Sequence, residues 1–198
     1  MNKYVVIDTE TTGLDFNKHE VIGFGGIVLI NGVITETIEV LIHPARPEQA
    51  DPKALEVNGY SPKKWRDAIP ANVAIDTIGE FLLRHSDGTL VGHNVNFDIQ
   101  FLKRFGALWQ GGYGYQFPKP YLDTRDLCRA VLSPFGLESM SLDNICAFLG
   151  WERRRAHTAL SDCEDCIRLI QNICPPSPRF LVRLHAMKAI RKIKGVLK

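Results

Sequence analysis

The order of hydrophobic and polar positions divides the chain into short strand-like and longer helix-like segments. Near the N-terminus, apolar residues form runs of strand length, many of them β-branched. Asn31-Gly32 between two runs is a strong hairpin signal, and glycines inside the second run indicate a bulge or a close backbone approach. The pattern predicts a strand that begins at Tyr4, strands at 21–30 and 33–42 that complete a three-strand meander, and short strands at 89–92 and 121–122.

Apolar residues recur every three or four positions in the segments between and after these strands, the period of an amphipathic helix. Asp51-Pro52 and Ser61-Pro62 each place an N-cap residue before a proline at the first helical position, so a short helix is expected after each. The residues from 111 to 120 are expected to form a surface loop. Longer helices are predicted at 72–85, 96–105, 124–132, 141–149 and 159–174, which gives an α/β domain with helices on both sides of a mixed sheet.

The C-terminal segment differs from the rest of the chain in its charge. Prolines at 175, 176 and 178 end the last helix of the body, so we predict one domain at 1–175 and an extension at 176–198. The extension has seven basic residues and no acid, and without them the net charge of +2 becomes about −5. We expect a basic amphipathic helix, with four readings open: it packs on its own domain, docks onto a polymerase or another partner, holds nucleic acid, or binds an anionic membrane surface.

The composition is that of an ordinary globular protein, with 198 residues, 45% hydrophobic and 23% charged. No apolar run approaches the roughly 20 residues that span a bilayer, and no basic leader precedes the first strand. We therefore expect a cytoplasmic protein without stable membrane insertion. Cys163 and Cys166 have the spacing of zinc ligands, but no second such pair exists in the sequence. We therefore expect both on the buried apolar face of a helix.

Two acids lie at the end of the first predicted strand. Asp8 and Glu10 point to the same face of that strand, because side chains alternate, whereas Thr9 points away. Two neighbouring carboxylates at the end of an apolar strand repel each other, and burial of both is unfavourable unless a cation neutralises them. A hard divalent ion such as Mg²⁺ would do so. The alternative is a solvated strand end that carries two unrelated acids.

Two further acids and a histidine fall at helix starts. Asp98 lies just inside the helix after the fourth strand, and Asp162 lies near the start of the late helix, five residues after His157. If the fourth strand lies beside the first, all four carboxylates can gather into a site for two metal ions, which suits phosphodiester hydrolysis. His157 then has the position of a general base. Taken singly, Asp98 and Asp162 are each better explained as a helix cap or a solvated side chain, and their weight comes from occurring together.

Three motifs in this order resemble the DEDDh branch of the 3′→5′ exonucleases, the group that contains the proofreading epsilon subunit of bacterial DNA polymerase III. The first is Asp8-Thr9-Glu10-Thr11-Thr12-Gly13-Leu14, the second is Val91-Gly92-His93-Asn94-Val95-Asn96-Phe97-Asp98, and the third is His157-Thr158-Ala159-Leu160-Ser161-Asp162. The similarity runs from about residue 3 to residue 172.

The resemblance implies a ribonuclease H-like fold, with a central mixed five-stranded sheet made of the meander and two parallel strands. It implies two divalent cations, Mg²⁺ or Mn²⁺, with Asp8, Glu10 and Asp162 on the first. Asp8 would bridge to the second, near Asp98, and His157 would be the general base. The residues implied to receive the terminal nucleotide are Thr11, Thr12, Gly13, Leu14, Val57, His93, Asn94 and Phe97.

Some of these roles have simpler alternatives. Phe97 is equally well a core residue, and His93 could serve only to satisfy backbone groups. Asn58 stands where the family often has histidine, which affects base contacts near Val57 but not the metal site. Three arginines at 153–155, just before His157, are expected either to contact the incoming backbone or to form a solvated loop.

The predicted function is that of a metal-dependent 3′→5′ exonuclease, which hydrolyses single-stranded or frayed DNA 3′ ends to 5′-mononucleotides in proofreading or repair. One alternative is an RNA 3′-end trimming exonuclease of the same branch, because the motifs do not read the 2′-hydroxyl. Another is a catalytically silent nucleic-acid-binding partner with the same fold. The expected partners are a nucleic acid 3′ end and a DNA polymerase, or another replication or repair protein, bound through the C-terminal helix.

Overall fold

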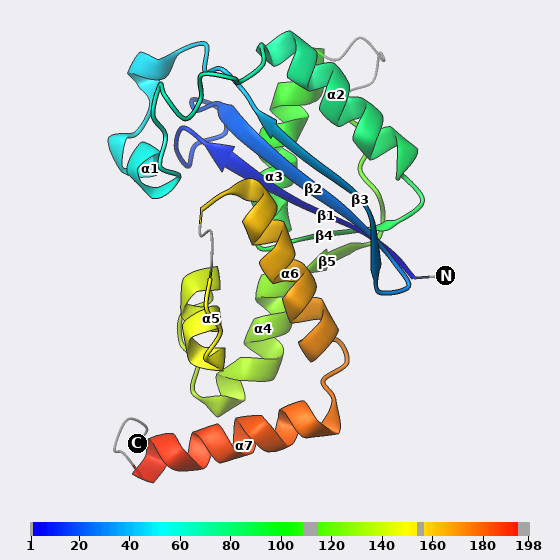
Figure 1. Cartoon of the computed structure of the whole chain (residues 1–198), viewed down its shortest axis with the longest axis vertical. Coiled ribbons are helices and arrows are strands. Elements are labelled where there is room, and N and C mark those ends of the chain that lie inside the picture. Colours follow the sequence, from blue (N-terminus) through cyan, green and yellow to red (C-terminus); the bar gives the residue numbers. More distant parts are fainter. Residues whose placement is uncertain (1, 109–114, 154–156, 194–198) are drawn as a thin grey trace.

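A single mixed sheet organises the molecule, as the computed structural model shows for residues 2–108, 115–153 and 157–193 (Figure 1). Its strand order is β3-β2-β1-β4-β5, with β1 in the centre. The first three strands form an antiparallel meander, and β4 and β5 run parallel to β1, so the predicted sheet is confirmed. The strands are β1 (Lys3–Thr11), β2 (Val21–Ile30), β3 (Val33–Leu41), β4 (Thr89–Gly92) and β5 (Tyr121–Asp123).

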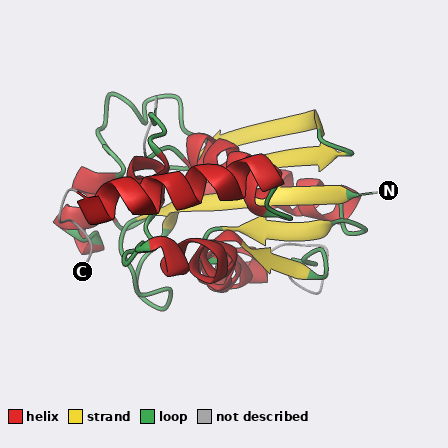
Figure 2. Cartoon of the chain, turned by 90° about the horizontal axis from the view of Figure 1, so that it is seen from below, coloured by secondary structure: helices red, strands yellow, loops and turns green. Residues whose placement is uncertain are grey.

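The predicted hairpin joins β2 to β3. Asn31 and Gly32 both adopt positive φ, 50° and 85°, which a two-residue turn with the twist of its flanking strands requires. Figure 2 shows the strands side by side from the end of the molecule where the last helix lies.

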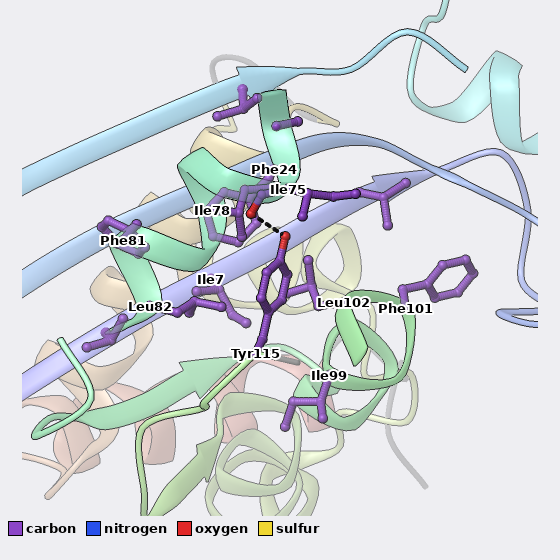
Figure 3. Packing of buried hydrophobic residues seen from close by; sticks show 14 of the residues in the cluster. Ile7, Phe24, Ile75, Ile78, Phe81, Leu82, Ile99, Phe101, Leu102 and Tyr115 are labelled. Carbon is purple, nitrogen blue, oxygen red and sulfur yellow. Dashed lines mark hydrogen bonds between the residues drawn. The ribbon is translucent and has the colours of Figure 1, made fainter. Parts of the chain in front are cut away.

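Helices cover both faces of the sheet (Figure 1). On one face, helices α2 and α3 enclose a core with Val5 and Ile7 of β1 (Figure 3). On the other, α6 packs against Val6 of β1 and Ile27 of β2. The helices are α1 (Pro52–Val57), α2 (Ala71–Arg84), α3 (Val95–Phe105), α4 (Thr124–Leu132), α5 (Leu142–Leu149), α6 (Ala159–Ile173) and α7 (Pro178–Ile193), with short 3₁₀ turns η1 (Pro47–Gln49), η2 (Gly106–Leu108) and η3 (Ser133–Phe135).

Gly25 of β2 allows α6 to approach the sheet closely. A Cβ on Gly25 would lie 2.5 Å from the backbone carbonyl carbon of Ala159, the first residue of α6. Cys163, one turn further along α6, is fully buried, with its Sγ 3.4 Å from the Gly25 carbonyl oxygen. The close backbone approach expected from the strand glycines is therefore present, and it brings the first turn of α6 over β1 and β2.

Two local expectations were wrong. The segment after Ser61-Pro62 forms consecutive turns rather than a helix, because the Trp65 indole turns inward and donates to the carbonyl of Ile22 at 2.8 Å. The segment expected as a surface loop contains a core residue, Tyr115, whose hydroxyl donates to the Ile75 carbonyl at 2.8 Å (Figure 3). The part of that segment at 111–114 lies outside the described residues.

Helix α7 packs on the domain through its N-terminal half. Phe180 and Leu184 are buried in a cluster with residues of α4, α5 and α6. Arg183 and Arg191 donate to the carbonyls of Leu149 and Phe148 at the C-terminal end of α5, where a helix leaves carbonyls unpaired. Three of its basic side chains, those two and Lys188, thus contact the chain itself, whereas Lys194 and Lys198 lie outside the described residues.

Candidate active site

The two acids of β1 face the helix that carries the third. Val6 packs under α6, so Asp8 and Glu10, two and four residues further along the strand, point to the same face. Thr9 points to the opposite face, toward α3, as predicted. Glu10 pairs in register with Gly23 of β2, and the ladder becomes irregular immediately afterwards, between Glu10 and Thr11. Both acids therefore lie on regular strand, at the point where it gives way to the loop.

Asp98 approaches the same strand end from α3. Its side chain is 3% exposed, and its Oδ1 accepts hydrogen bonds from the backbone N–H of Thr9 at 2.9 Å and the Thr9 hydroxyl at 2.7 Å. Thr9 therefore fixes the Asp98 carboxylate at the same end of β1 that carries Asp8 and Glu10. The expectation that Asp98 reaches this cluster depended on β4 lying beside β1, and the two strands do pair in parallel.

Asp123 sets the start of α3 and was missed from the sequence. Its carboxylate accepts from the backbone N–H groups of Asn94 and Val95, at 2.9 and 3.1 Å, and also caps α4 by accepting from Arg125 N–H at 2.9 Å. Asn94 adopts a left-handed conformation, with φ of 70°. Asp123 thus holds the turn that carries Asp98 into the site. Its position directly before Thr124 reads only as a helix cap in the sequence.

Asp162 lies in the first turn of α6, with 15% of its side chain exposed. Thr158 caps this helix by accepting from Ser161 N–H at 3.2 Å. The Asp162 Oδ1 accepts a hydrogen bond from the Ser161 hydroxyl at 3.3 Å and forms an ion pair with Arg153. Arg153 was expected to lie in a nucleic-acid-contacting or solvated loop, whereas its side chain is only 7% exposed; Arg154 and Arg155 lie outside the described residues.

His157 lies at the rim of a cleft of about 500 Å³. Asp8, Asp162, His93 and Asn94 line the same cleft. The His157 Nε2 is 3.7 Å from Asp143 Oδ2, and the residue adopts a positive φ of 65°. Glu10 and His157 also line a smaller adjoining pocket of about 90 Å³. The cleft therefore brings together residues from all three motifs.

The expected nucleotide-binding residues divide into two groups. Thr11 and Thr12 are buried, and the Thr12 N–H donates to the Glu20 carbonyl at 2.9 Å, so this loop is held within the fold. Asn58 is also buried and donates to the Thr11 carbonyl at 3.1 Å. Two apolar side chains next to this loop are free to meet a ligand: Leu14, 78% exposed, and Val57, 51% exposed.

The second group consists of His93, Asn94 and Phe97, which have structural contacts of their own. Phe97 packs on Phe101, with ring centroids 4.7 Å apart, at the edge of the core. His93 bonds to the Thr124 hydroxyl through Nδ1 and to the Met140 carbonyl through Nε2, and burial lowers its pKa. These contacts agree with the simpler alternatives named for Phe97 and His93.

Burial disfavours the charged form of all four acids, and for Asp8 and Glu10 the charges of other site acids add to this effect. Burial raises the pKa of Glu10 to about 7, assisted by Asp162, and burial also raises the pKa of Asp98 to about 7. The pKa of Asp8 is raised well above its usual range by burial and then by the nearby charges of Asp98, Asp162 and Glu10. Burial raises the pKa of Asp162 as well, with Arg153 opposing that rise. The four carboxyl groups therefore resist being ionised together, although Arg153 supplies one positive charge beside Asp162.

This donor set fits a hard divalent cation, because carboxylate oxygens are its preferred ligands and a cation would relieve the repulsion. Within residues 2–108, 115–153 and 157–193, however, no three acidic, histidine or cysteine side chains converge closely enough to form a ready-made metal cage. The structure thus provides the charge deficit and the ligand chemistry, with Arg153 as the one basic side chain paired directly to Asp162.

We predict that, without divalent cations, the melting temperature falls as the pH rises from 5.5 to 8. Glu10 and Asp98 have folded-state pKa values near 7, above their ordinary values, so the folded state holds protons that the unfolded chain has released. The stability they contribute is complete below pH 4 and is lost as the pH passes about 7. We expect a decrease of at least about 5 °C, measured by thermal unfolding in EDTA. A Glu10→Gln variant should show a shallower decrease, and an equally steep one would contradict the assignment.

No helix among the described residues has the length and apolar character needed to cross a membrane.

The sequence and the fold are similar to those of known exonucleases and DNA polymerase III proteins. A family model described as Exonuclease matches residues 5–170. The DNA polymerase III PolC-type protein of Thermotoga maritima is 34% identical over 160 residues, which are 80% of this chain and 11% of that protein. The DNA polymerase III subunit epsilon of Aquifex aeolicus is 32% identical over 161 residues, 80% of this chain and 74% of that one.

E. coli exonuclease I, solved in complex with a dT13 oligonucleotide, has the same fold, with a TM-score of 0.73 at 19% identity over 92% of this chain and 43% of that one. The predicted ribonuclease H-like fold and the predicted class of enzyme are therefore confirmed. Since the family model spans most of the sequence and includes all three motifs, this chain is a member of the exonuclease family, in the DEDDh branch that its motifs resemble.

Proposed function

We propose that this exonuclease hydrolyses single-stranded or frayed DNA from the 3′ end and releases 5′-mononucleotides with the help of two divalent cations. The observation that carries the proposal is the gathering of acids from β1, α3 and α6 around one end of the sheet, where the charges of Asp98, Asp162 and Glu10 raise the pKa of Asp8. His157 lines the same cleft as Asp8 and Asp162. A cluster with this charge deficit and hard oxygen ligands is the setting for metal-assisted phosphodiester hydrolysis.

The proposed ligands are Asp8, Glu10 and Asp162 for one cation, and Asp8 with Asp98 for the other. Bound Mg²⁺ or Mn²⁺ would acidify a water and provide counter-charge to the leaving oxygen. Thr9 keeps the buried Asp98 carboxylate in place through two hydrogen bonds. The chain's own contribution to metal binding is thus a set of carboxylates fixed on regular elements.

His157 takes a proton from the attacking water in this proposal. Its imidazole opens to the cleft that Asp8 and Asp162 also line, and 38% of the side chain is exposed, so it can reach a water there. The Asp143 Oδ2 lies 3.7 Å from the Nε2 of His157.

The loop after β1 receives the terminal nucleotide. Leu14 is 78% exposed, which leaves an apolar surface for a base to stack on, and Val57 of α1 offers a second. Contacts of this kind do not read the sequence of the bases.

DNA is proposed as the substrate, since the relatives are named as DNA polymerase III proteins and the exonuclease I structure contains a DNA oligonucleotide. By the same analogy the chain acts with a DNA polymerase or another replication or repair protein in the cytoplasm, bound through α7. The side of α7 opposite its buried residues exposes Val182 and Ile190, 69% and 52% respectively.

The test uses oligomers of DNA and RNA of the same sequence, labelled at the 5′ end, with Mg²⁺ or with EDTA, and an Asp8→Ala variant as control. We expect stepwise shortening of the DNA from the 3′ end with Mg²⁺ only, and no shortening by Asp8→Ala. Faster shortening of the RNA would replace DNA by RNA as the substrate. Tight binding of either oligomer by wild type and variant, with both inert, would mean a nucleic-acid-binding protein without turnover.

A further inference from the structure

Arg153 is enclosed by carboxylates on three sides. Each of its guanidinium nitrogens contacts a different acid: Nη1 contacts Asp143 of α5, Nη2 contacts Asp162 of α6, and Nε contacts Asp165 of α6 at 2.7 Å. The Arg153 side chain is 7% exposed, and those of Asp162 and Asp165 are 15% and 14% exposed, so these two ion pairs are shielded, whereas Asp143 is 55% exposed. By contrast, the Arg129–Asp126 pair of α4 has 52% and 70% of its side chains exposed. Exposed pairs contribute little to stability, whereas an enclosed pair is strongly coupled to its surroundings.

The position of this guanidinium matters because Asp162 is one of the proposed metal ligands. Its Oδ1 is occupied by two donors from the chain itself, Arg153 and the Ser161 hydroxyl. Arg153 also lines the cleft that contains Asp8 and His157. One positive charge from the chain therefore lies inside the acid cluster, against the carboxylate that a divalent cation would need.

We propose that Arg153 is an internal counter-ion of the metal site: it holds Asp162 when no cation is bound, and its charge sets the Mg²⁺ concentration at which the site fills. The proposal depends on the proposed function, since it takes Asp162 to be a metal ligand. Arg153 is a positioning residue in this account, because it acts through Asp162 and not on the substrate.

The geometry allows Arg153 to release Asp162 without losing its own partners. If a divalent cation takes over Asp162, the guanidinium keeps Asp143 and Asp165 and is never left as an unpaired buried charge. The bound Mg²⁺ and the Arg153 guanidinium nevertheless repel each other, so the charge of Arg153 weakens Mg²⁺ binding. An opposite view is that Arg153 only orients Asp162 for the metal, as ligand-supporting contacts do. The two views predict changes of opposite sign when the charge is removed.

The experiment measures Mg²⁺ binding in the wild type, Arg153→Gln and Arg153→Lys, by isothermal calorimetry and by the rise in melting temperature. Arg129→Gln, which removes an exposed arginine, is the matched control. We expect Arg153→Gln to have a lower melting temperature than wild type without metal. We also expect it to bind Mg²⁺ about tenfold more tightly, because one neighbouring opposite charge weakens the proton affinity of a carboxylate by about tenfold or more. Arg153→Lys retains the charge and should bind Mg²⁺ nearly as wild type does.

Each result has a distinct meaning. If wild type and the control bind no divalent cation, the proposed metal site itself is wrong. If wild type binds Mg²⁺ and Arg153→Gln binds it equally or more weakly, the counter-ion proposal is overturned and the metal site stands. If Arg153→Gln is unfolded in EDTA, circular dichroism should recover its helix signal when Mg²⁺ is added, and failure to recover would also overturn the proposal.

Discussion

Replacing Asp8 by asparagine is expected to lower kcat by at least about 10³-fold. Divalent cations stabilise the transition state of hydrolysis by several kcal/mol, and Asp8 is the proposed bridge between the two cations. The same change should raise the melting temperature of the metal-free protein at pH 8. Burial and the charges of Asp98, Asp162 and Glu10 raise the pKa of Asp8 well above its usual range, so an uncharged side chain of the same shape relieves that repulsion. A loss of activity together with a gain of stability is characteristic of a functional acid.

Asp126→Asn is the matched control, because Asp126 is an exposed acid of α4 that forms an ion pair with Arg129, outside the proposed site. It should leave both kcat and the melting temperature within error of wild type. Rates are measured in single-turnover reactions with excess enzyme, and melting is followed in EDTA. An Asp8→Asn protein with lower stability than wild type would mean that Asp8 supports the fold and that its lost activity carries no information about metals.

These two effects depend on placements that the sequence predicted well. The alternation along β1 predicted Asp8 and Glu10 on one face, and the apolar period of α6 predicted Asp162 near the start of that helix. The positions of these three acids therefore followed from strand and helix geometry. The glycines of β2 predicted a close backbone approach, and the backbone of α6 at Ala159 does lie close to Gly25. Regular elements with one buried face are the part of a structure that a hydrophobic pattern specifies most directly.

The wrong and missing predictions lie where a side chain reaches across the molecule from irregular backbone. Ser61-Pro62 has the local signature of a helix start, but the bond from the Trp65 indole to Ile22 competes with it, and a local motif contains no information on a partner 43 residues away. Tyr115 enters the core from a segment rich in glycine and proline for a similar reason. The sequence predicted Arg153 to be in a loop that is solvated or contacts nucleic acid. The three acids that pair with it lie on two different helices, so no local pattern indicated them.

The same distinction applies to the supporting residues of the site. Asp123 reads as an N-cap of α4, which it is, but its bonds to Asn94 and Val95 arise only because β4 and β5 lie side by side. Thr9 reads as a residue pointing away from the acids, which is also correct, and that direction is what allows it to hold Asp98. Sequence motifs thus identified the acids, whereas the groups that orient them required the tertiary structure.

His157→Gln is expected to lower kcat by about 10²–10⁴-fold, the usual contribution of a general base, and to leave Mg²⁺ binding and oligonucleotide affinity near their wild-type values. The reason is that His157 reaches the cleft from the loop before α6 and belongs to none of the proposed ligand sets, so its loss removes a proton acceptor and no metal contact. His185→Gln is the matched control, because His185 is an exposed histidine on α7 that bonds to the Leu181 carbonyl of its own helix and packs against the ring of Phe135, outside the proposed site. Single-turnover rates and calorimetric Mg²⁺ titrations of both variants distinguish the possible roles. Weaker Mg²⁺ binding by His157→Gln would make His157 a metal ligand, and an unchanged rate would remove it from the reaction and leave the water's proton to another group in the cleft.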